Sequence, residues 1–283
     1  MAAVLWTIAG DTLDLSQRAL LMGVLNVTPD SFSDGGQFLE IERALTQGLQ
    51  MVAEGARIID VGGESTRPGA AAVDETEELR RVLPVISGLR ARCDALVSID
   101  TSKAAVAQAA MEAGATIVND ISGGRADGAM MTRAAAGGAA FIIMHMQGTP
   151  RTMQENPQYD DVVSEVADFF RQQYARALEC GIDPMAIAFD PGIGFGKTLA
   201  HNLELLRRLP ELRVAERPLV VGVSRKSFLG KVIGSSSMAD RIAPTVALTG
   251  LLRERGANVL RVHDVKPNAA ALRMTEALLE SRA

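Results

Sequence analysis

The stretch ALLMGVLNVTPDSFSDGG, residues 19–36, decides between two common folds built from alternating strands and helices. Its apolar run ends at Asn26 and passes into a segment of hydroxyl, acidic and proline residues that closes on two glycines. A doubly wound nucleotide-binding sheet usually carries a glycine fingerprint directly after its first strand, and none follows this run. A (β/α)8 barrel instead places polar residues after its strands. The stretch therefore favours a barrel.

The same alternation continues along the rest of the chain. Short apolar, β-branched runs are separated by stretches of helical period, which is typical of a parallel sheet covered on both faces. We therefore predict one α/β domain over residues 1–283, a (β/α)8 TIM barrel preceded by an N-terminal β-hairpin that turns at Gly10-Asp11. The expected strands are residues 19–26, 57–62, 95–100, 116–121, 139–146, 185–192, 218–224 and 258–264. The expected helices are residues 42–56, 74–91, 103–115, 160–181, 202–209, 240–257 and 268–282.

Composition limits the classes of protein to consider. The 283 residues are 47% hydrophobic and 22% charged, which is typical of a globular chain. A net charge of -5 argues against nucleic-acid binding, which needs a concentrated basic surface. Two cysteines are too few for a disulfide framework and favour a reducing compartment. With no basic start and no long uncharged run, we expect a cytoplasmic protein with no membrane partner.

Polar side chains follow every expected strand. A single Asp or Asn in such a place is often only a helix N-cap, but eight polar strand ends together predict a polar site at one end of the barrel. Acceptors follow the early strands and cations follow the late ones, so we expect a ligand with a donor-rich flat group and an anionic tail. The residues are Asn26, Asp60, Asp100, Asn119, Asp120, His145, Asp190, Ser224, Arg225, Lys226, Arg261 and His263.

The glycine-rich stretch FDPGIGFGKT, residues 189–198, is similar to a phosphate-binding loop but lacks its spacing. The preceding strand also ends in Asp190, which would repel phosphate. We therefore interpret the glycines as allowing close approach of the backbone to a flat ring, with Phe195 beside that ring.

Several motifs together resemble one family. MGVLNVTPDSFSDGG, IDVGGESTRPGA, SIDT, VNDISGG, MHMQGTP, FDPGIGFGKT, GVSRKSFLG and RVHDV are similar, in this order, to the motifs of the dihydropteroate synthases of folate biosynthesis. The similarity runs from about residue 22 to residue 265. It implies a transferase that joins para-aminobenzoate to hydroxymethyl-dihydropterin pyrophosphate and releases pyrophosphate. Because pyrophosphate is a good leaving group and the attacking nitrogen belongs to the second substrate, no enzyme nucleophile is needed.

The resemblance also implies three subsites. The expected pterin contacts are Asp100, Asn119, Met144, Asp190 and Lys226, to which the glycine-rich stretch adds Phe195. The expected pyrophosphate contacts are Asn26, Thr66, Arg67, Arg261 and His263, with Mg2+ bound through Asn26. The expected para-aminobenzoate contacts are Phe32, Thr66, Pro68 and Ser227, and sulfonamide inhibitors would occupy the same place.

The family implies a dissociative route, in which pyrophosphate leaves a stabilised pterin cation before para-aminobenzoate attacks. The expected catalytic residues are Asp100, Asp190, Lys226 and Asp34. The carboxylates would stabilise the cation, and the loops after the first two strands would exclude water. The family further implies a homodimer.

Four alternatives stay open at this stage. Lys226 suits a Schiff-base lysine of an aldolase barrel, and His145 suits a metal ligand. A pterin-dependent methyltransferase would share the later motifs but lack the two opening ones. A non-catalytic relative would keep the barrel and lose a loop motif or the Arg261 and His263 pair.

Overall fold

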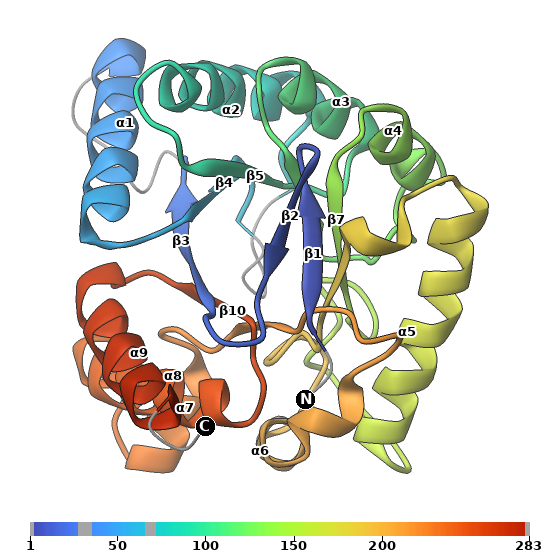
Figure 1. Cartoon of the computed structure of the whole chain (residues 1–283), viewed down its shortest axis with the longest axis vertical. Helices are drawn as coiled ribbons and strands as arrows, with labels where there is room; N and C mark the ends of the chain where they lie inside the picture. Colours follow the sequence, from blue (N-terminus) through green and yellow to red (C-terminus); the bar gives the residue numbers. More distant parts are fainter. Residues whose placement is uncertain (1–2, 28–35, 66–71, 281–283) are drawn as a thin grey trace.

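Eight parallel strands form the predicted barrel in the computed structural model, which describes residues 3–27, 36–65 and 72–280 (Figure 1). Their order around the sheet is β8-β7-β6-β5-β4-β3-β10-β9, and a parallel bridge between Phe189 and Leu219 joins its two edges. The (β/α)8 prediction is confirmed. The strands are β3 Leu20–Asn26, β4 Ile58–Gly62, β5 Leu96–Asp100, β6 Ile117–Asp120, β7 Ala140–Met144, β8 Ile187–Asp190, β9 Val220–Gly222 and β10 Val259–Val262.

The helices form a ring around these strands (Figure 1). They are α1 Gly36–Glu54, α2 Glu75–Arg90, α3 Ala104–Glu112, α4 Met130–Ala136, α5 Val162–Glu179, α6 Leu199–Arg207, α7 Ser227–Ile233, α8 Ile242–Glu254 and α9 Val265–Glu280. The sequence predicted neither α4 nor α7, and it placed the start of α1 six residues too late. None of the described helices is long and apolar enough to cross a membrane.

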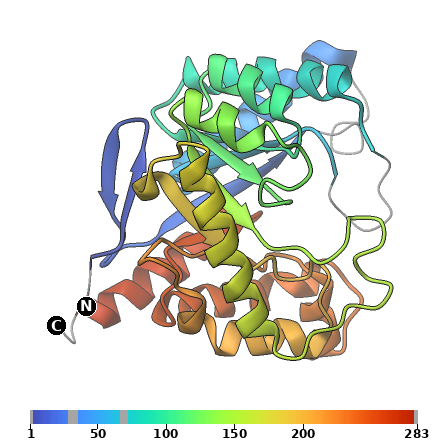
Figure 2. The same ribbon diagram turned by 90° about the vertical axis from the view of Figure 1, so that its right-hand side faces the viewer.

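The predicted hairpin is also confirmed, and it covers one end of the barrel (Figure 2). Strands β1 Leu5–Ile8 and β2 Asp11–Asp14 pair antiparallel, with Ile8 opposite Asp11. The Trp6 side chain is fully buried and its indole nitrogen donates to the carbonyl of Ala186, 3.1 Å away, just before β8. This contact places the hairpin at the amino-terminal ends of the strands. The opposite end, where the strands finish, is left for the site.

Strand register brings the polar residues together. Asp60 on β4 pairs with Ser98 on β5, and Asp100 on β5 pairs with Asn119 on β6. Paired residues of neighbouring parallel strands point to the same face of the sheet. Asp60 and Asp100 both contact Arg261 on β10, a strand that neighbours neither β4 nor β5, so these polar residues face the barrel interior.

Candidate active site

Arg261 on β10 reaches across the barrel to two carboxylates. Its Nε donates to Asp60 Oδ2 at 2.6 Å, and its Nη2 donates to Asp100 Oδ2 at 2.7 Å. Asn119 Nδ2 donates to the same Asp60 oxygen at 3.1 Å. A guanidinium carries five N–H donors, so two such contacts leave others for an anion. The sequence predicted that the guanidinium binds only the anionic part of the ligand. The structure shows that it is also the counter-ion of Asp60 and Asp100.

Burial dominates the electrostatics of this cluster. It raises the pKa of Asp100 to about 7. The positive charge of Arg261 opposes this increase, and the negative charge of Asp60 adds to it. Burial also disfavours the charged form of Arg261, but Asp60 and Asp100 outweigh this and raise the Arg261 pKa above its ordinary value. The cluster therefore combines one cation with two acids in a site poorly screened by water, where its charges act strongly on a ligand.

Two strand ends place a second acid beside a lysine. Asp190 ends β8, and its Oδ1 accepts from the backbone nitrogen of Gly192 at 2.7 Å. Lys226 lies in the turn between β9 and α7, where its Nζ donates to the carbonyl of Ile193 and sits 4.7 Å from the centre of the Phe195 ring. Burial raises the pKa of Asp190 and lowers that of Lys226 to about 8, and each charge opposes the shift of the other. The pair offers a buried acceptor and a donor to one ligand.

An apolar wall lies beside these groups. Met144, Ile121, Met146 and Met153 form a small buried cluster, separate from the main barrel core, and Phe195 packs against it. Methionine adapts its shape and makes favourable contacts with aromatic rings. The wall therefore suits a flat heteroaromatic ligand.

The other predicted residues that the structure describes lie at the same end of the barrel. Asn26 ends β3 and is partly buried. A Cβ built on Gly62 would lie 3.7 Å from Asn26 Oδ1 and 3.8 Å from Asp100 Oδ2, so both oxygens face the space over this glycine. The backbone nitrogen and the Nδ1 of His263 each lie 3.1 Å from Ser224 Oγ. Ser227 is the exposed first residue of α7.

Five of the predicted site residues lie outside the described part of the chain. They are Phe32, Asp34, Thr66, Arg67 and Pro68.

His145 does not have the surroundings of a metal ligand. Its Nδ1 lies 2.9 Å from the Nζ of Lys197, and no cluster of three His, Cys, Asp or Glu side chains that could hold a metal occurs among the described residues. His201 instead completes a capping box with Thr198 at the start of α6. The metal-ligand alternative for His145 therefore has no support in this part of the structure.

Sequence reasoning gave no role to three residues at this end of the barrel. Asp60 and Ser224 were noted only among the polar strand-end residues, and Lys197 only as part of a rejected phosphate loop. The signal for Asp60 was its place on the strand before Asp100, two residues before the strand end and therefore on the same face as the residue paired with Asp100. Lys197 gave no signal, because its partner lies 52 residues away in the sequence.

Comparison with known proteins gives consistent results. A family model described as pterin binding enzyme matches residues 22–263. The dihydropteroate synthase of Escherichia coli strain K12 is 46% identical over 273 residues, which cover 96% of each chain. The solved dihydropteroate synthase of Yersinia pestis in a sulfonamide complex is 45% identical, with a TM-score of 0.91 over 98% of this chain and 100% of that one. The Xanthomonas albilineans enzyme with 4-aminobenzoic acid is 42% identical, with a TM-score of 0.91 over 98% of this chain and 99% of that one.

Proposed function

The chain belongs to the dihydropteroate synthase family of pterin-binding enzymes, and from this premise we propose how its residues divide the work of the reaction. The enzyme is a transferase that condenses hydroxymethyl-dihydropterin pyrophosphate with para-aminobenzoate and releases pyrophosphate. The single observation that carries the division of roles is the grouping of buried acids deep in the barrel with the Arg261 guanidinium across from them.

The pterin subsite lies between the two acid clusters. Asp190 accepts the hydrogen bonds of the pterin amino group and ring N–H, and these bonds are charge-assisted when the carboxyl is ionised. Lys226 donates to the ring oxygen, while Asp100 and Asn119 bind the opposite edge. Met144 and Phe195 cover the ring faces, as their shared apolar cluster supports.

The pyrophosphate subsite uses Arg261, His263 and Asn26. Arg261 keeps donors available beyond its two carboxylate contacts. Thr66 and Arg67, outside the described residues, would complete the subsite. The space over Gly62, faced by the oxygens of Asn26 and Asp100, fits a hard cation that takes oxygen ligands.

Mg2+ would be held there by Asn26 Oδ1, with substrate phosphates and waters as its other ligands. A single protein amide suffices for such an ion, because Mg2+ usually keeps several waters. The ion would supply positive charge that neutralises the departing pyrophosphate.

The para-aminobenzoate subsite is proposed at the rim. Relatives are solved with 4-aminobenzoic acid and with a sulfonamide, and we extend both ligands to this chain. Ser227, the exposed first residue of α7, supports one side of this subsite. Phe32, Thr66 and Pro68, outside the described residues, would form the other side. Asp34, in the same segment as Phe32, would face the attacking amine or the metal.

The residues suit a dissociative substitution. Asp100 and Asp190 place negative charge around the pterin, which stabilises the cation formed when pyrophosphate leaves. Arg261 and His263 hold the leaving group on the other side. Because these groups are fixed before the reaction by contacts within the barrel, they stabilise the transition state without having to reorganise.

The test of function is pyrophosphate release by purified protein. With pterin pyrophosphate, para-aminobenzoate and Mg2+, we expect release to match dihydropteroate formation one to one, and to stop on addition of a sulfonamide or of excess EDTA. Restored release after added Mg2+ is the control for the chelator. Release that continues unchanged in EDTA would contradict the metal proposal. Pterin binding without turnover would instead indicate a non-catalytic relative, and methyl transfer would indicate the methyltransferase.

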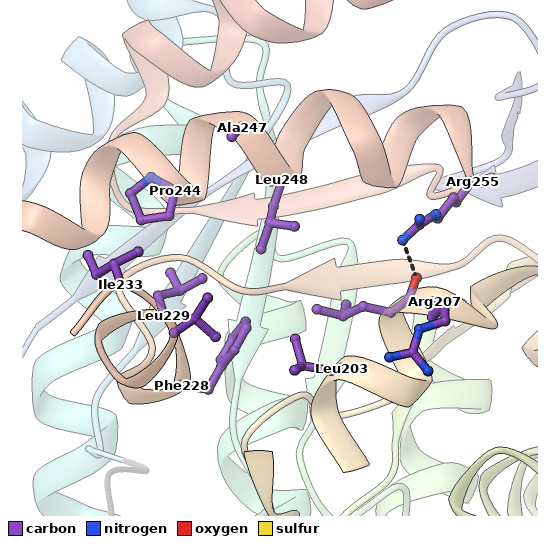
Figure 3. Close-up of a pocket in the computed structure, with 11 residues that line it drawn as sticks. Leu203, Arg207, Phe228, Leu229, Ile233, Pro244, Ala247, Leu248 and Arg255 are labelled. Atoms are coloured by element: carbon purple, nitrogen blue, oxygen red, sulfur yellow. Dashed lines mark hydrogen bonds between the residues drawn. The ribbon is translucent and has the colours of Figure 1, made fainter. Parts of the chain in front are cut away.

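We also propose that the chain is a homodimer that pairs through α6, α7 and α8. A hollow of about 350 Å3 lies between these helices, lined by Leu206, Phe228, Leu229, Pro244 and Leu248 among others (Figure 3). Large apolar side chains around it are exposed to solvent. Val232 is 57% exposed, Ile233 43% and Leu203 36%. Exposed apolar side chains gathered in this way are typical of protein interfaces, and a second copy of the same surface would cover them.

Substitution of Val232 by glutamate is expected to weaken this dimer at least tenfold, because a charge would be buried in an apolar contact. Sedimentation equilibrium measures the effect. Leu178→Glu on α5 is the matched control, since Leu178 is also exposed but lies outside the surface on α6, α7 and α8. A monomeric wild-type protein, or a dimer insensitive to Val232→Glu, would contradict the proposal.

We place the protein in the cytoplasm. Its two cysteines, Cys93 and Cys180, are both free thiols and partly buried, which is compatible with a reducing compartment.

A further inference from the structure

Lys197 is a buried lysine that the roles above do not use. It is 3% exposed and lies in the loop between β8 and α6. Its Nζ contacts three acceptors, namely His145 Nδ1 at 2.9 Å, the Phe195 carbonyl at 2.9 Å and the His145 carbonyl at 3.3 Å. A lysine is costly to bury, so its burial here needs a reason beyond filling space.

The partner of Lys197 is held in a fixed orientation. The His145 ring packs edge-on against Phe169, with centroids 4.9 Å apart, and its backbone nitrogen donates to the Asp190 carbonyl at 3.0 Å. Burial and the nearby Lys197 charge lower the pKa of His145 to about 2, so the imidazole is neutral. A neutral imidazole has one nitrogen that accepts a hydrogen bond, and Nδ1 is the nitrogen that faces the Lys197 amine. Lys197 therefore meets a positioned acceptor.

The loop that carries Lys197 lies directly against the end of β7. A Cβ on Gly192 would lie 1.9 Å from the His145 carbonyl, and one on Gly196 would lie 2.5 Å from the Gln147 carbonyl. Both glycines have positive φ, 62° and 63°, so a side chain there would be strained as well. Glycine allows this close approach but does not hold the loop in place. Gln154 and Tyr159 donate to the carbonyls of Gly194 and Gly196, and Lys197 supplies a further, buried tie to the end of β7.

The residues at both ends of this contact are next to the apolar wall described above. His145 follows Met144 at the end of β7, and Phe195, whose carbonyl Lys197 binds, supplies the aromatic ring near Lys226. Met144 and Phe195 belong to the same buried apolar cluster. Movement of the loop relative to β7 would change the distance between these two side chains.

We propose that Lys197 is a positioning residue that sets the spacing of Met144 and Phe195, and thereby the affinity of the site for the flat pterin ring. It acts through the loop and the strand end and does not touch the substrate. This inference rests on the pterin subsite proposed above.

The test is Lys197→Met, which keeps an unbranched side chain but removes the three hydrogen bonds. Calorimetry with pterin pyrophosphate and Mg2+, without para-aminobenzoate, is expected to show a Kd about tenfold higher with the number of sites unchanged. That change corresponds to about 1.4 kcal/mol. The KM for para-aminobenzoate should stay within twofold. Lys231→Met, at an exposed position on α7, is the control and should bind the pterin as the wild type does.

A purely structural role gives a different result. In that case Lys197→Met lowers the melting temperature or the number of competent sites but leaves the pterin Kd within twofold, and the proposal is wrong. If Lys197→Met does not fold, His145→Asn provides the test, because it replaces the imidazole that contacts Lys197 with a shorter side chain and leaves the lysine in place. We expect it to raise the Kd severalfold, and an unchanged Kd would overturn the proposal.

Failure of the subsite itself is recognised separately. Asp190→Asn with unchanged pterin affinity would place the pterin elsewhere. Weaker binding by Asp190→Asn with no effect of Lys197→Met would reject the positioning role alone.

Discussion

Replacement of Asp190 by asparagine is expected to weaken pterin pyrophosphate binding about 100-fold. A carboxylate accepts hydrogen bonds from two ring donors, whereas the amide accepts one and presents its own N–H groups to the other. Loss of a charge-assisted hydrogen bond costs about 1.5–3 kcal/mol. The contact between the asparagine N–H groups and a pterin N–H donor adds to this cost. The fold should be retained, because asparagine has the same shape and its oxygen can still accept from the Gly192 nitrogen.

The same substitution has a second effect on the neighbouring lysine. Burial lowers the Lys226 pKa to about 8, and the Asp190 charge opposes that shift. Without this charge the Lys226 pKa falls further, so Lys226 loses its proton at a lower pH than in the wild type. As the pH rises, the pterin affinity of the variant should therefore begin to decline at a lower pH than that of the wild type. Titration calorimetry between pH 6 and pH 9 measures both effects.

Asp168→Asn is the matched control for this experiment. Asp168 is an exposed carboxylate on α5 that pairs with Arg171, and its substitution should leave pterin affinity unchanged. An Asp190→Asn variant with wild-type affinity would show that the pterin ring binds elsewhere in the barrel.

The barrel could be predicted because its strands carry their own signal. Residues 140–144 and 58–62 are buried along their whole length, so their sequences are nearly continuous apolar runs. An exposed segment would not show such a run. The helices α4 and α7 were missed for a related reason. Each has seven residues, too few for a helical period to be recognised, and packing against the barrel stabilises them.

The strand-end residues could be predicted, but their contacts could not. The sequence predicted Arg261 and His263 together at the end of the last strand. It gave no indication that the long Arg261 side chain crosses from β10 to Asp60 and Asp100, on strands that are not its neighbours. Contacts across a barrel depend on its diameter and on side-chain length, and neither appears in the local pattern. The contact between Lys197 and His145 escaped prediction because the two residues lie 52 positions apart in the sequence, in a loop and at the end of a neighbouring strand.

The cross-barrel contact predicts a large loss of stability for Arg261→Met. Asp60 is fully buried, its Oδ1 has no hydrogen-bond partner within the described residues, and Asp100 would also lose its cation. Removal of one partner of a buried ion pair typically costs about 3–5 kcal/mol, because the remaining charge is uncompensated. We expect a decrease of this size in the free energy of unfolding at pH 8, measured by urea denaturation. Turnover should fall as well, since the proposed pyrophosphate subsite would lose its guanidinium.

The pH dependence identifies the cause of that loss. The folded-state pKa of Asp100, about 7, is above its usual 3.8, so between these values the folded protein binds a proton that the unfolded chain does not. The stability contributed by this group is therefore present at low pH and is lost as the pH rises toward 7. Arg261 opposes the increase, so its removal moves the Asp100 pKa higher and extends the loss above pH 7. The defect of Arg261→Met should be largest near pH 8 and smaller near pH 5.

A second substitution separates lost charge compensation from lost packing. In Arg261→Met both buried acids lose their cation, whereas the double variant with Asp60→Asn keeps only one such acid. The double variant should therefore be more stable than Arg261→Met alone at pH 8. Arg171→Met, which breaks an exposed ion pair, should change the free energy of unfolding by less than about 1 kcal/mol. A single and a double variant of equal stability, with no change between pH 5 and pH 8, would show that packing of the arginine stem dominates. In that case Asp100 would have to be neutral in the folded protein, and it could not supply the negative charge that the proposed cation stabilisation requires.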